Sequence, residues 1–181
     1  MAEVAGVSAD KVWDVVFASG LEERFEAGAV DERQFYETFC RETGTQPAKE
    51  ALLDAASAIF SLNRSIVPVI AQLDAAGYRM GILSNTCGPH WSYCTAGRFA
   101  IISQAFDVFA LSYQIGACKP DPKVFQAAAK LAGVAPQEIF YTDDIAGNVT
   151  AARQAGFDAV QYTTTPELVR DLHARGVRFN Y

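Results

Sequence analysis

The sequence has no long apolar run and no excess of positive charge. No apolar run among its 181 residues approaches the length of roughly 18 residues that a membrane-spanning helix needs. With 15 Lys and Arg against 21 Asp and Glu, the net charge is -6, which does not favour binding to nucleic acid or anionic lipid. The start, MAEVAGVSAD, carries an acidic residue where a signal peptide carries basic ones. We therefore predict a cytoplasmic protein that binds neither nucleic acid nor a membrane.

Cysteine is scarce as well, and its spacing excludes a disulfide scaffold. The four cysteines form no CxxC pair, so reduced thiols are expected. Cys87, His90 and Cys94 would share one face of a helix at a spacing that can bind zinc. Because the other histidine, His173, lies far along the chain and no fourth ligand is evident, we favour a helix that packs small residues over a zinc site.

The rest of the composition is that of a folded protein. Half of the residues are hydrophobic and 20% are charged, which excludes a disordered or collagen-like chain. The length allows one domain with a full core and a modest insertion, whereas two large domains would not fit.

The first sixty residues are helical in pattern. Segments 9–19, 31–42 and 47–60 fit amphipathic helices, and no convincing strand occurs among them. The region is rich in aromatic residues, which we interpret as the core of a small helical subdomain because a small bundle needs large side chains to bury enough area. These residues are Trp13, Phe17, Phe25, Phe35, Tyr36, Phe39 and Phe60.

From residue 60 onward, helical and strand-like segments alternate, which is typical of crossover units in a parallel sheet. We predict an α/β fold with a Rossmann-like parallel sheet and flanking helices. The predicted strands are 78–83, 105–113, 138–142 and 159–163, and the predicted helices are 66–76, one from about 89, 120–131, 146–155 and 166–174.

Polar side chains follow three of these strands. In open α/β sheets, ligands bind outside the carboxyl ends of the strands. Ser84, Asn85 and Thr86 follow the first strand, and a hydroxyl with backbone N–H groups near it at a helix start suits a phosphoryl oxygen. Lys119 supplies a compact positive charge. Adjacent carboxylates at Asp143 and Asp144 repel each other unless a cation such as Mg²⁺ lies near.

Each of these residues has a structural interpretation too. The segment 84–86 could cap the next helix, Lys119 could be a solvated loop charge, and Asp143 or Asp144 could be an N-cap. We favour the functional interpretation because a hydroxyl, a lysine and an acidic pair at successive strand ends are the parts that phosphoryl transfer needs.

On these residues the sequence resembles the haloacid dehalogenase (HAD) superfamily of hydrolases. GILSNT (81–86) is similar to its second motif, the lysine of CKPDPKVF to its third, and FYTDDIAGNVTAARQAG (140–156) to its fourth. The helical stretch SGLEERFEAGAVDERQFYETF resembles the inserted cap of the phosphatase-like and dehalogenase-like branch. The resemblance implies a helical cap subdomain at 1–62 and a HAD-like α/β core at 63–181.

The resemblance also implies a role for each motif residue. Ser84 and Lys119 would hold the transferred phosphoryl group, Asp144 would coordinate Mg²⁺ and Asp143 would support it. The acidic pair favours a metal-dependent phosphatase over a dehalogenase, whose displacement at carbon needs no metal. The substrate would be a small phosphorylated metabolite, and a homodimer is left open.

The family's first motif, a strand that ends in a nucleophilic Asp with a second Asp two residues later, is absent. No DxD occurs in the chain, and the nearest strand-like run, 12–19, would put Ala18 at the nucleophile position. We therefore interpret 12–19 as a cap helix and expect the chain to begin after the nucleophile strand.

In the fold that the resemblance implies, the absent strand lies between those ending at Ser84 and Asp143, so its loss would open the sheet by roughly 10 Å. Unpaired backbone groups in a core are costly. We therefore expect the two flanking strands to pair directly, segment 12–19 to insert between them, or a strand to be swapped in from another molecule.

Two functions remain open. One is a Mg²⁺-dependent phosphatase of small phosphorylated metabolites, inactive as this chain stands because the nucleophilic Asp is absent. The other is a non-catalytic protein with this fold that acts by binding another protein. A phospho-acceptor receiver domain has similar polar residues, but its acidic pair comes early and its lysine late, so we give it little weight.

Overall fold

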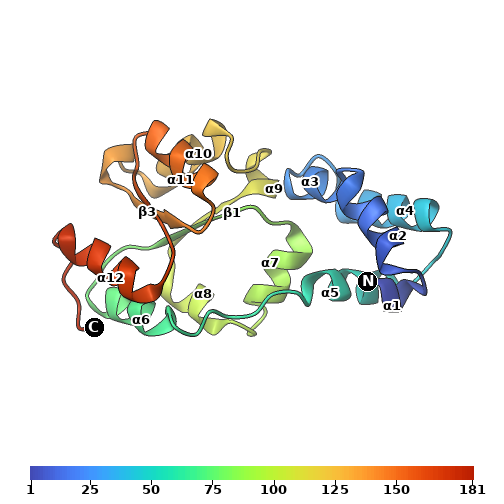
Figure 1. The fold of residues 1–181 in the computed structure, drawn as a ribbon, viewed down its shortest axis with the longest axis horizontal. Helices are drawn as coiled ribbons and strands as arrows, with labels where there is room; N and C mark the ends of the chain where they lie inside the picture. Colours follow the sequence, from blue (N-terminus) through green and yellow to red (C-terminus); the bar gives the residue numbers. More distant parts are fainter. The chain divides into compact units, whose positions relative to one another are not determined.

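The structure, a computed structural model, describes all residues from 1 to 181 (Figure 1). The first sixty residues contain helices and no strand, as predicted. In chain order these are α1 (Ala2–Ala5), α2 (Ala9–Trp13), the π-helix η1 (Asp14–Ala18), α3 (Leu21–Glu26), α4 (Glu32–Thr43) and α5 (Lys49–Ser57).

Helices and strands alternate in the rest of the chain, which confirms the α/β fold class. The four strands lie close to the predicted segments, with starts shifted by up to three residues and ends by up to two. The elements are α6 (Val67–Ala75), β1 (Gly81–Ser84), α7 (Gly88–Thr95), α8 (Ala100–Ala105), β2 (Val108–Leu111), α9 (Ser112–Ile115), α10 (Pro122–Ala132), the 3-10 helix η2 (Pro136–Glu138), β3 (Phe140–Asp143), α11 (Ala146–Gln154), β4 (Asp158–Gln161) and α12 (Thr165–Ala174).

Local chemistry explains why the predicted ends of α4, 31–42, are accurate to one residue. At the start of α4, the Gln34 backbone N–H donates to Asp31 Oδ1 at 2.7 Å, and the Asp31 N–H donates to Gln34 Oε1 at 2.9 Å. This reciprocal capping satisfies two N–H groups that the helix cannot bond internally. The helix stops at Gly44, whose φ of 72° favours glycine.

Three local features differ from the prediction. Segment 9–19 is not one regular α-helix, because it continues from α2 as the π-helix η1. The strand predicted at 105–113 is confined to Val108–Leu111, since its first residue ends α8 and its last two begin α9. The helix α8 was not predicted, because six residues are too few to show a helical period clearly.

The chain divides into two compact units. The first unit comprises Met1–Ser61, Ser84–Arg98 and Leu111–Cys118, and the second comprises Leu62–Leu83, Phe99–Ala110 and Lys119–Tyr181. The first unit therefore contains α7 and α9 as well as the N-terminal helices. The interpretation of 1–62 as a cap and 63–181 as a core stays a prediction.

Aromatic residues from α3 and α4 form the centre of the first unit. Phe35 and Phe39 are at most 1% exposed, and Phe25 stacks on Phe35 with ring centroids 4.6 Å apart. The prediction was wrong for other aromatics: Trp13 is 61% exposed and Phe17 is 48% exposed. These two rings contact each other four residues apart along the helix, at 5.1 Å between centroids. Phe60 is also exposed and Tyr36 is half-buried.

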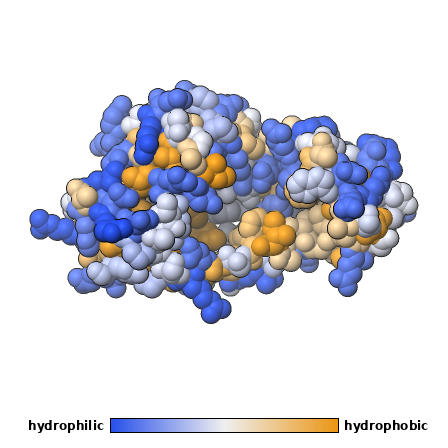
Figure 2. All heavy atoms as spheres, in the orientation of Figure 1, coloured by the Kyte–Doolittle hydropathy of each residue, from blue (hydrophilic) through white to orange (hydrophobic).

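Exposed hydrophobic residues are scattered over the chain. Figure 2 shows hydrophobic residues, in orange, as separate patches among hydrophilic ones on the face drawn. The residues that contribute most exposure include Ile59 and Ile145. No helix is both long enough and apolar enough to cross a membrane.

In the second unit, β3 and β4 form a parallel pair joined by α11. Phe140 lies opposite Asp158 and Asp143 lies opposite Gln161. The α6 and α12 helices pack together through Val69, Leu168 and Leu172, with Phe140 of β3 against them. A parallel pair joined through a helix is the βαβ unit that the alternating pattern predicts.

The four strands form two separate pairs, because β1 pairs with β2 and β3 with β4. The predicted direct pairing of the strands that end at Ser84 and Asp143 is therefore wrong. Segment 12–19 does not insert as a strand either, since it is helical up to Ala18. Gly81 of β1 is exposed, and all four residues of β3 are half-buried.

Candidate active site

Lys119 and Asp143 form a close ion pair in the second unit. Lys119 Nζ lies 2.7 Å from Asp143 Oδ2, and the two side chains are 11% and 6% exposed. The same ammonium donates to the backbone carbonyl of Leu83 at 3.0 Å. Asp143 is the last residue of β3 and Lys119 lies three residues before α10. The interpretation of Lys119 as a solvated loop charge is therefore wrong.

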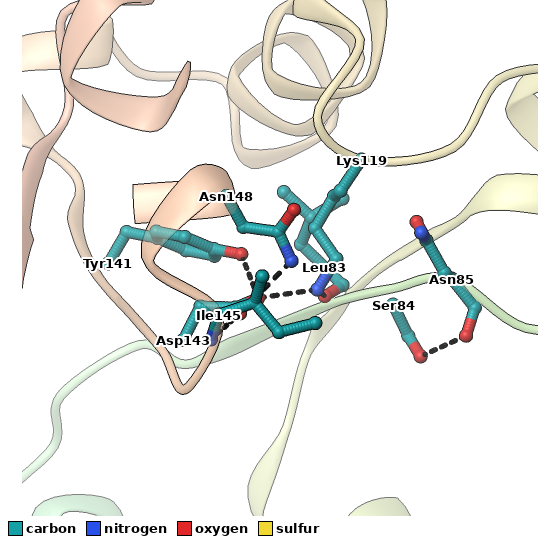
Figure 3. Close-up of polar contacts among 8 residues, drawn as sticks. All are labelled: Leu83, Ser84, Asn85, Lys119, Tyr141, Asp143, Ile145 and Asn148. Carbon is teal, nitrogen blue, oxygen red and sulfur yellow. Dashed lines mark hydrogen bonds and ion pairs between the residues drawn. The ribbon is translucent and has the colours of Figure 1, made fainter. Parts of the chain in front are cut away.

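Both oxygens of Asp143 accept hydrogen bonds from several donors (Figure 3). Tyr141 donates its hydroxyl to Oδ2 at 2.6 Å, beside Lys119. The Ile145 backbone N–H donates to Oδ1 at 2.9 Å, and Asn148 Nδ2 donates to the same oxygen at 3.0 Å. A carboxylate has about four lone-pair sites, so these four donors hold Asp143 in one orientation.

These contacts determine the charge of Asp143. Burial by itself would raise its pKa, but hydrogen bonds from Lys119, Tyr141 and Ile145 and the charge of Lys119 outweigh burial and lower the pKa below its ordinary value. Burial, followed by the hydrogen bond and charge of Asp143, raises the pKa of Tyr141. At neutral pH the carboxylate is therefore ionised and the phenol is a donor.

Two of the residues that hold Asp143 were not predicted. Tyr141 lies two positions before Asp143, so the alternation of a strand puts both side chains on one face. Its ring packs edge-on against Phe125 and Phe157, with centroids 5.8 and 6.1 Å away. Asn148 is a polar residue only 5% exposed in α11. Both could have been found by extending the strand-end analysis along the chain on either side of Asp143.

Asp144 is more exposed to solvent than Asp143. Its side chain is exposed, and its backbone carbonyl accepts a hydrogen bond from Gln161 Nε2 at 2.8 Å. Neither acid is the N-cap of α11, a position that Ile145 holds. Asp143 nevertheless stabilises the turn into this helix through the Ile145 N–H.

Ser84 and Asn85 follow Leu83 directly and belong to the first unit. Ser84 Oγ donates to the Asn85 carbonyl at 3.2 Å. The alternative that this segment caps the next helix is wrong, because Cys87 is the N-cap of α7 and no side chain caps it. The predicted roles of Ser84, Asn85, Lys119, Asp143 and Asp144 in one site stay predictions.

A buried serine that was not predicted fixes the chain after Asn85. Ser112 Oγ donates to the Thr86 carbonyl at 3.0 Å and accepts from the Thr86 N–H at 2.8 Å. Both residues are at most 5% exposed. The segment between β1 and α7 is therefore held by the start of α9.

Comparisons with known proteins agree with this description. A family model described as haloacid dehalogenase-like hydrolase matches residues 8–156. A phosphatase of Mycobacterium tuberculosis is 33% identical over 117 residues, which is 60% of this chain and 52% of that protein. The D-ribitol-5-phosphate phosphatase of Bacteroides thetaiotaomicron is 31% identical over 88 residues, 46% of this chain and 43% of that protein. The chain thus spans about half the length of these relatives.

Solved structures show the same fold. A predicted HAD-like hydrolase from Porphyromonas gingivalis matches with a TM-score of 0.77 and 24% identity, covering 94% of this chain and 85% of that one. A HAD family enzyme from Bacteroides thetaiotaomicron, crystallised as an aspartate-to-alanine mutant with magnesium and inorganic phosphate, matches with a TM-score of 0.74 and 22% identity. That match covers 84% of this chain and 80% of the other.

Proposed function

Because the chain belongs to the haloacid dehalogenase-like hydrolase family, we propose that it has the site of a Mg²⁺-dependent phosphatase of small phosphorylated metabolites. The observation that carries this proposal is the buried pair of Lys119 and Asp143 at the carboxyl end of β3, with Asp144 exposed beside it. Relatives that are phosphatases by name support the same reaction class. The cytoplasmic location and a homodimer remain expectations from the sequence.

Lys119 and Ser84 are the residues proposed to hold the phosphoryl group. A lysine ammonium attracts phosphoryl oxygens as a compact charge, and a serine hydroxyl donates a hydrogen bond to them. The contacts of Lys119 with Asp143 and Leu83 keep the ammonium at the strand ends without substrate, so little reorganisation is needed on binding. Asn85 is proposed as a further polar residue of this site.

The acidic residues fit Mg²⁺. This ion is commonly held by one or two carboxylates together with waters and substrate phosphate oxygens. Asp144 offers an exposed carboxylate, and the four donors on Asp143 fix the turn from which Asp144 projects. When bound, Mg²⁺ would neutralise charge on the phosphoryl group. The Lys119 ammonium would donate a hydrogen bond to the same phosphoryl group.

The chain by itself lacks a side chain for nucleophilic attack. It has no DxD, and Ala18, the residue at the matching place in the nearest strand-like run, lies in the π-helix η1. We therefore propose that the 181-residue chain binds phosphate and Mg²⁺ but forms no aspartyl-phosphate. The same observation supports the second candidate, a non-catalytic protein of this fold that acts by binding another protein.

Binding of inorganic phosphate to the purified chain tests the site. Isothermal titration calorimetry should show binding that requires Mg²⁺ and weakens at least about tenfold in Lys119→Ala, since a hydrogen bond to a charged group contributes about 1.5–3 kcal/mol. Lys130→Ala, an exposed lysine in α10, is the matched control. Equal affinity in the wild type and Lys119→Ala would contradict the proposal.

Turnover separates the two candidate functions. We expect no hydrolysis of p-nitrophenyl phosphate by the 181-residue chain. A fusion that places a strand ending in Asp-x-Asp ahead of Met1 should hydrolyse it when Mg²⁺ is present, and changing the first of those aspartates to Asn should abolish the activity. A folded fusion that binds phosphate without hydrolysing it would favour the non-catalytic function.

A further inference from the structure

Three potential metal ligands converge in the first unit. Glu22 and Glu26 are four residues apart on α3, so their side chains lie on one face of that helix, and His90 lies near the start of α7. One ligand atom from each of these side chains lies within 4.8 Å of the other two. None of the three is among the residues assigned to the phosphatase site.

The histidine provides an independent indication of a ligand. The His90 side chain is 6% exposed, and its buried Nδ1 has no hydrogen-bond partner. The Glu22 Oε1 atom is 3.9 Å from Nδ1, which is too far for a hydrogen bond. Buried polar atoms nearly always have a partner, so Nδ1 needs one that the protein itself does not provide.

The imidazole ring is held with this nitrogen facing the glutamates. A hydrogen bond to the backbone of Ala56 fixes the ring from α5, and the ring of Phe60 meets it edge-on with centroids 5.0 Å apart. In metal sites, the ring nitrogen that does not bind the metal commonly makes a hydrogen bond of this kind, which fixes the tautomer. His90 therefore has the orientation of a histidine ligand.

A bound cation would stabilise the neighbouring carboxylates of Glu22 and Glu26. Glu22 and Glu26 are both half-buried with carboxylate oxygens close together, and two close carboxylates repel each other. A cation between the two would remove this repulsion. The Glu22 side chain is 19% exposed, so an ion can reach the cluster from solvent.

We propose that Glu22, Glu26 and His90 bind a divalent first-row transition-metal ion such as Zn²⁺. Zinc bonds to nitrogen and carboxylate oxygen are about 2.0–2.2 Å long, so two ligand atoms on one ion stand roughly 3–4 Å apart. The 3.9 Å between His90 Nδ1 and Glu22 Oε1 falls in this range. Small side-chain rotations would bring a carboxylate oxygen of Glu26 within bonding distance of the same ion. A nitrogen ligand favours such an ion over Mg²⁺ or Ca²⁺, which prefer oxygen.

This ligand set differs from the one considered from spacing alone. Of Cys87, His90 and Cys94, only His90 belongs to the converging group. Cys87 is fully buried, and burial raises the pKa of its thiol to about 12, so it remains protonated. The metal site would connect α3 to α7 inside the first unit, which is a structural role.

Zinc binding to the whole chain tests the proposal. Calorimetric titration with Zn²⁺ in excess Mg²⁺ should show one saturable equivalent, because Mg²⁺ occupies the oxygen-ligated site. Glu22→Gln and Glu26→Gln should each weaken binding at least about tenfold. Glu23→Gln changes an exposed acid on the same helix and should leave the affinity unchanged. Non-saturable binding, or equal affinity in all three variants, would overturn the proposal.

The absorption spectrum of bound Co²⁺ and the thermal melting temperature provide two further tests of the proposal. Bound Co²⁺ should give visible d–d absorption without a thiolate charge-transfer band, whereas a thiolate band would assign the metal to cysteines and overturn the proposal. Zn²⁺ should raise the thermal melting temperature of the wild type by a few degrees and not that of Glu22→Gln or Glu26→Gln. His90→Gln should also abolish the shift, and the two isosteric Glu variants carry the test if His90→Gln does not fold.

Discussion

Lys119 Nζ lies 2.7 Å from Asp143 Oδ2 and 3.0 Å from the carbonyl oxygen of Leu83. Asp143 ends β3 and Leu83 lies in β1, and these two strands do not pair with each other. One lysine side chain therefore connects the carboxyl ends of two strands that no backbone ladder joins. Its loss should affect both stability and phosphate binding.

Lys119→Ala should lower the free energy of unfolding by about 2–4 kcal/mol. Removing one partner of a buried ion pair leaves the other charge uncompensated, and the three remaining donors on Asp143 reduce that cost. Urea denaturation followed by circular dichroism measures the change. Lys130→Ala should stay within about 0.5 kcal/mol of the wild type. A loss below 1 kcal/mol in Lys119→Ala would show that the pair contributes little to the fold.

Ser112→Ala should destabilise the chain by about 1–3 kcal/mol. The Thr86 N–H and carbonyl both lose their side-chain partner, and an unsatisfied buried amide is costly. Because Thr86 follows Ser84 and Asn85 in the chain, phosphate affinity should fall as well. Ser103→Ala removes an exposed hydroxyl that donates to the Ala100 carbonyl and serves as the control. Unchanged stability and affinity in Ser112→Ala would argue against this role.

Gly28→Ala and Gly44→Ala should differ strongly although both glycines have positive φ, 68° and 72°. An added Cβ at Gly28 would clash with the backbone carbonyl of Tyr113, whereas at Gly44 it would meet nothing within 4 Å. We expect a loss of about 1 kcal/mol for Gly44→Ala, from left-handed backbone strain. Gly28→Ala should lose about 3 kcal/mol, since a backbone clash adds to that strain. Equal unfolding midpoints in urea would contradict the predicted clash.

The pair of Asp158 and Arg175 should make stability depend on acid pH. Arg175 Nε lies 2.5 Å from Asp158 Oδ2 and Nη2 lies 2.8 Å from Oδ1. The hydrogen bond and charge of Arg175 lower the pKa of Asp158 below its ordinary value. A lowered folded-state pKa stabilises the fold above the unfolded value of about 4, and this stabilisation disappears as the pH falls through the folded value.

Asp158→Asn should therefore remove part of the acid destabilisation. Between about pH 5 and about pH 2, the wild type should lose roughly 0.5 kcal/mol more stability than the variant, a small value because both side chains are partly exposed. Salt at about 1 M should reduce the difference by screening. Parallel curves for the two proteins across this pH range would show that the contact contributes nothing.

Much of the candidate site follows from strand ends. A run of apolar residues followed by a polar one predicts where a side chain projects from a sheet edge, and this identifies Asp143 at the end of β3. Lys119 follows a loop and not a strand end, and the structure pairs it with Asp143. Tyr141 and Asn148 were missed because the analysis stopped at the acidic pair. The exposed positions of Trp13 and Phe17 were missed for another reason, since helical spacing shows which residues share a face but not whether that face is covered.

The amino-acid sequence alone determined the α/β class, the family and the order of the four strands, because periodicity, capping residues and motifs act over a few neighbouring residues. Tertiary structure decided how the strands divide into two pairs, that Lys119 reaches Leu83, and that Glu22, Glu26 and His90 converge. Those contacts join residues dozens of positions apart. Their geometry depends on how whole elements pack, and no local pattern of residues encodes that.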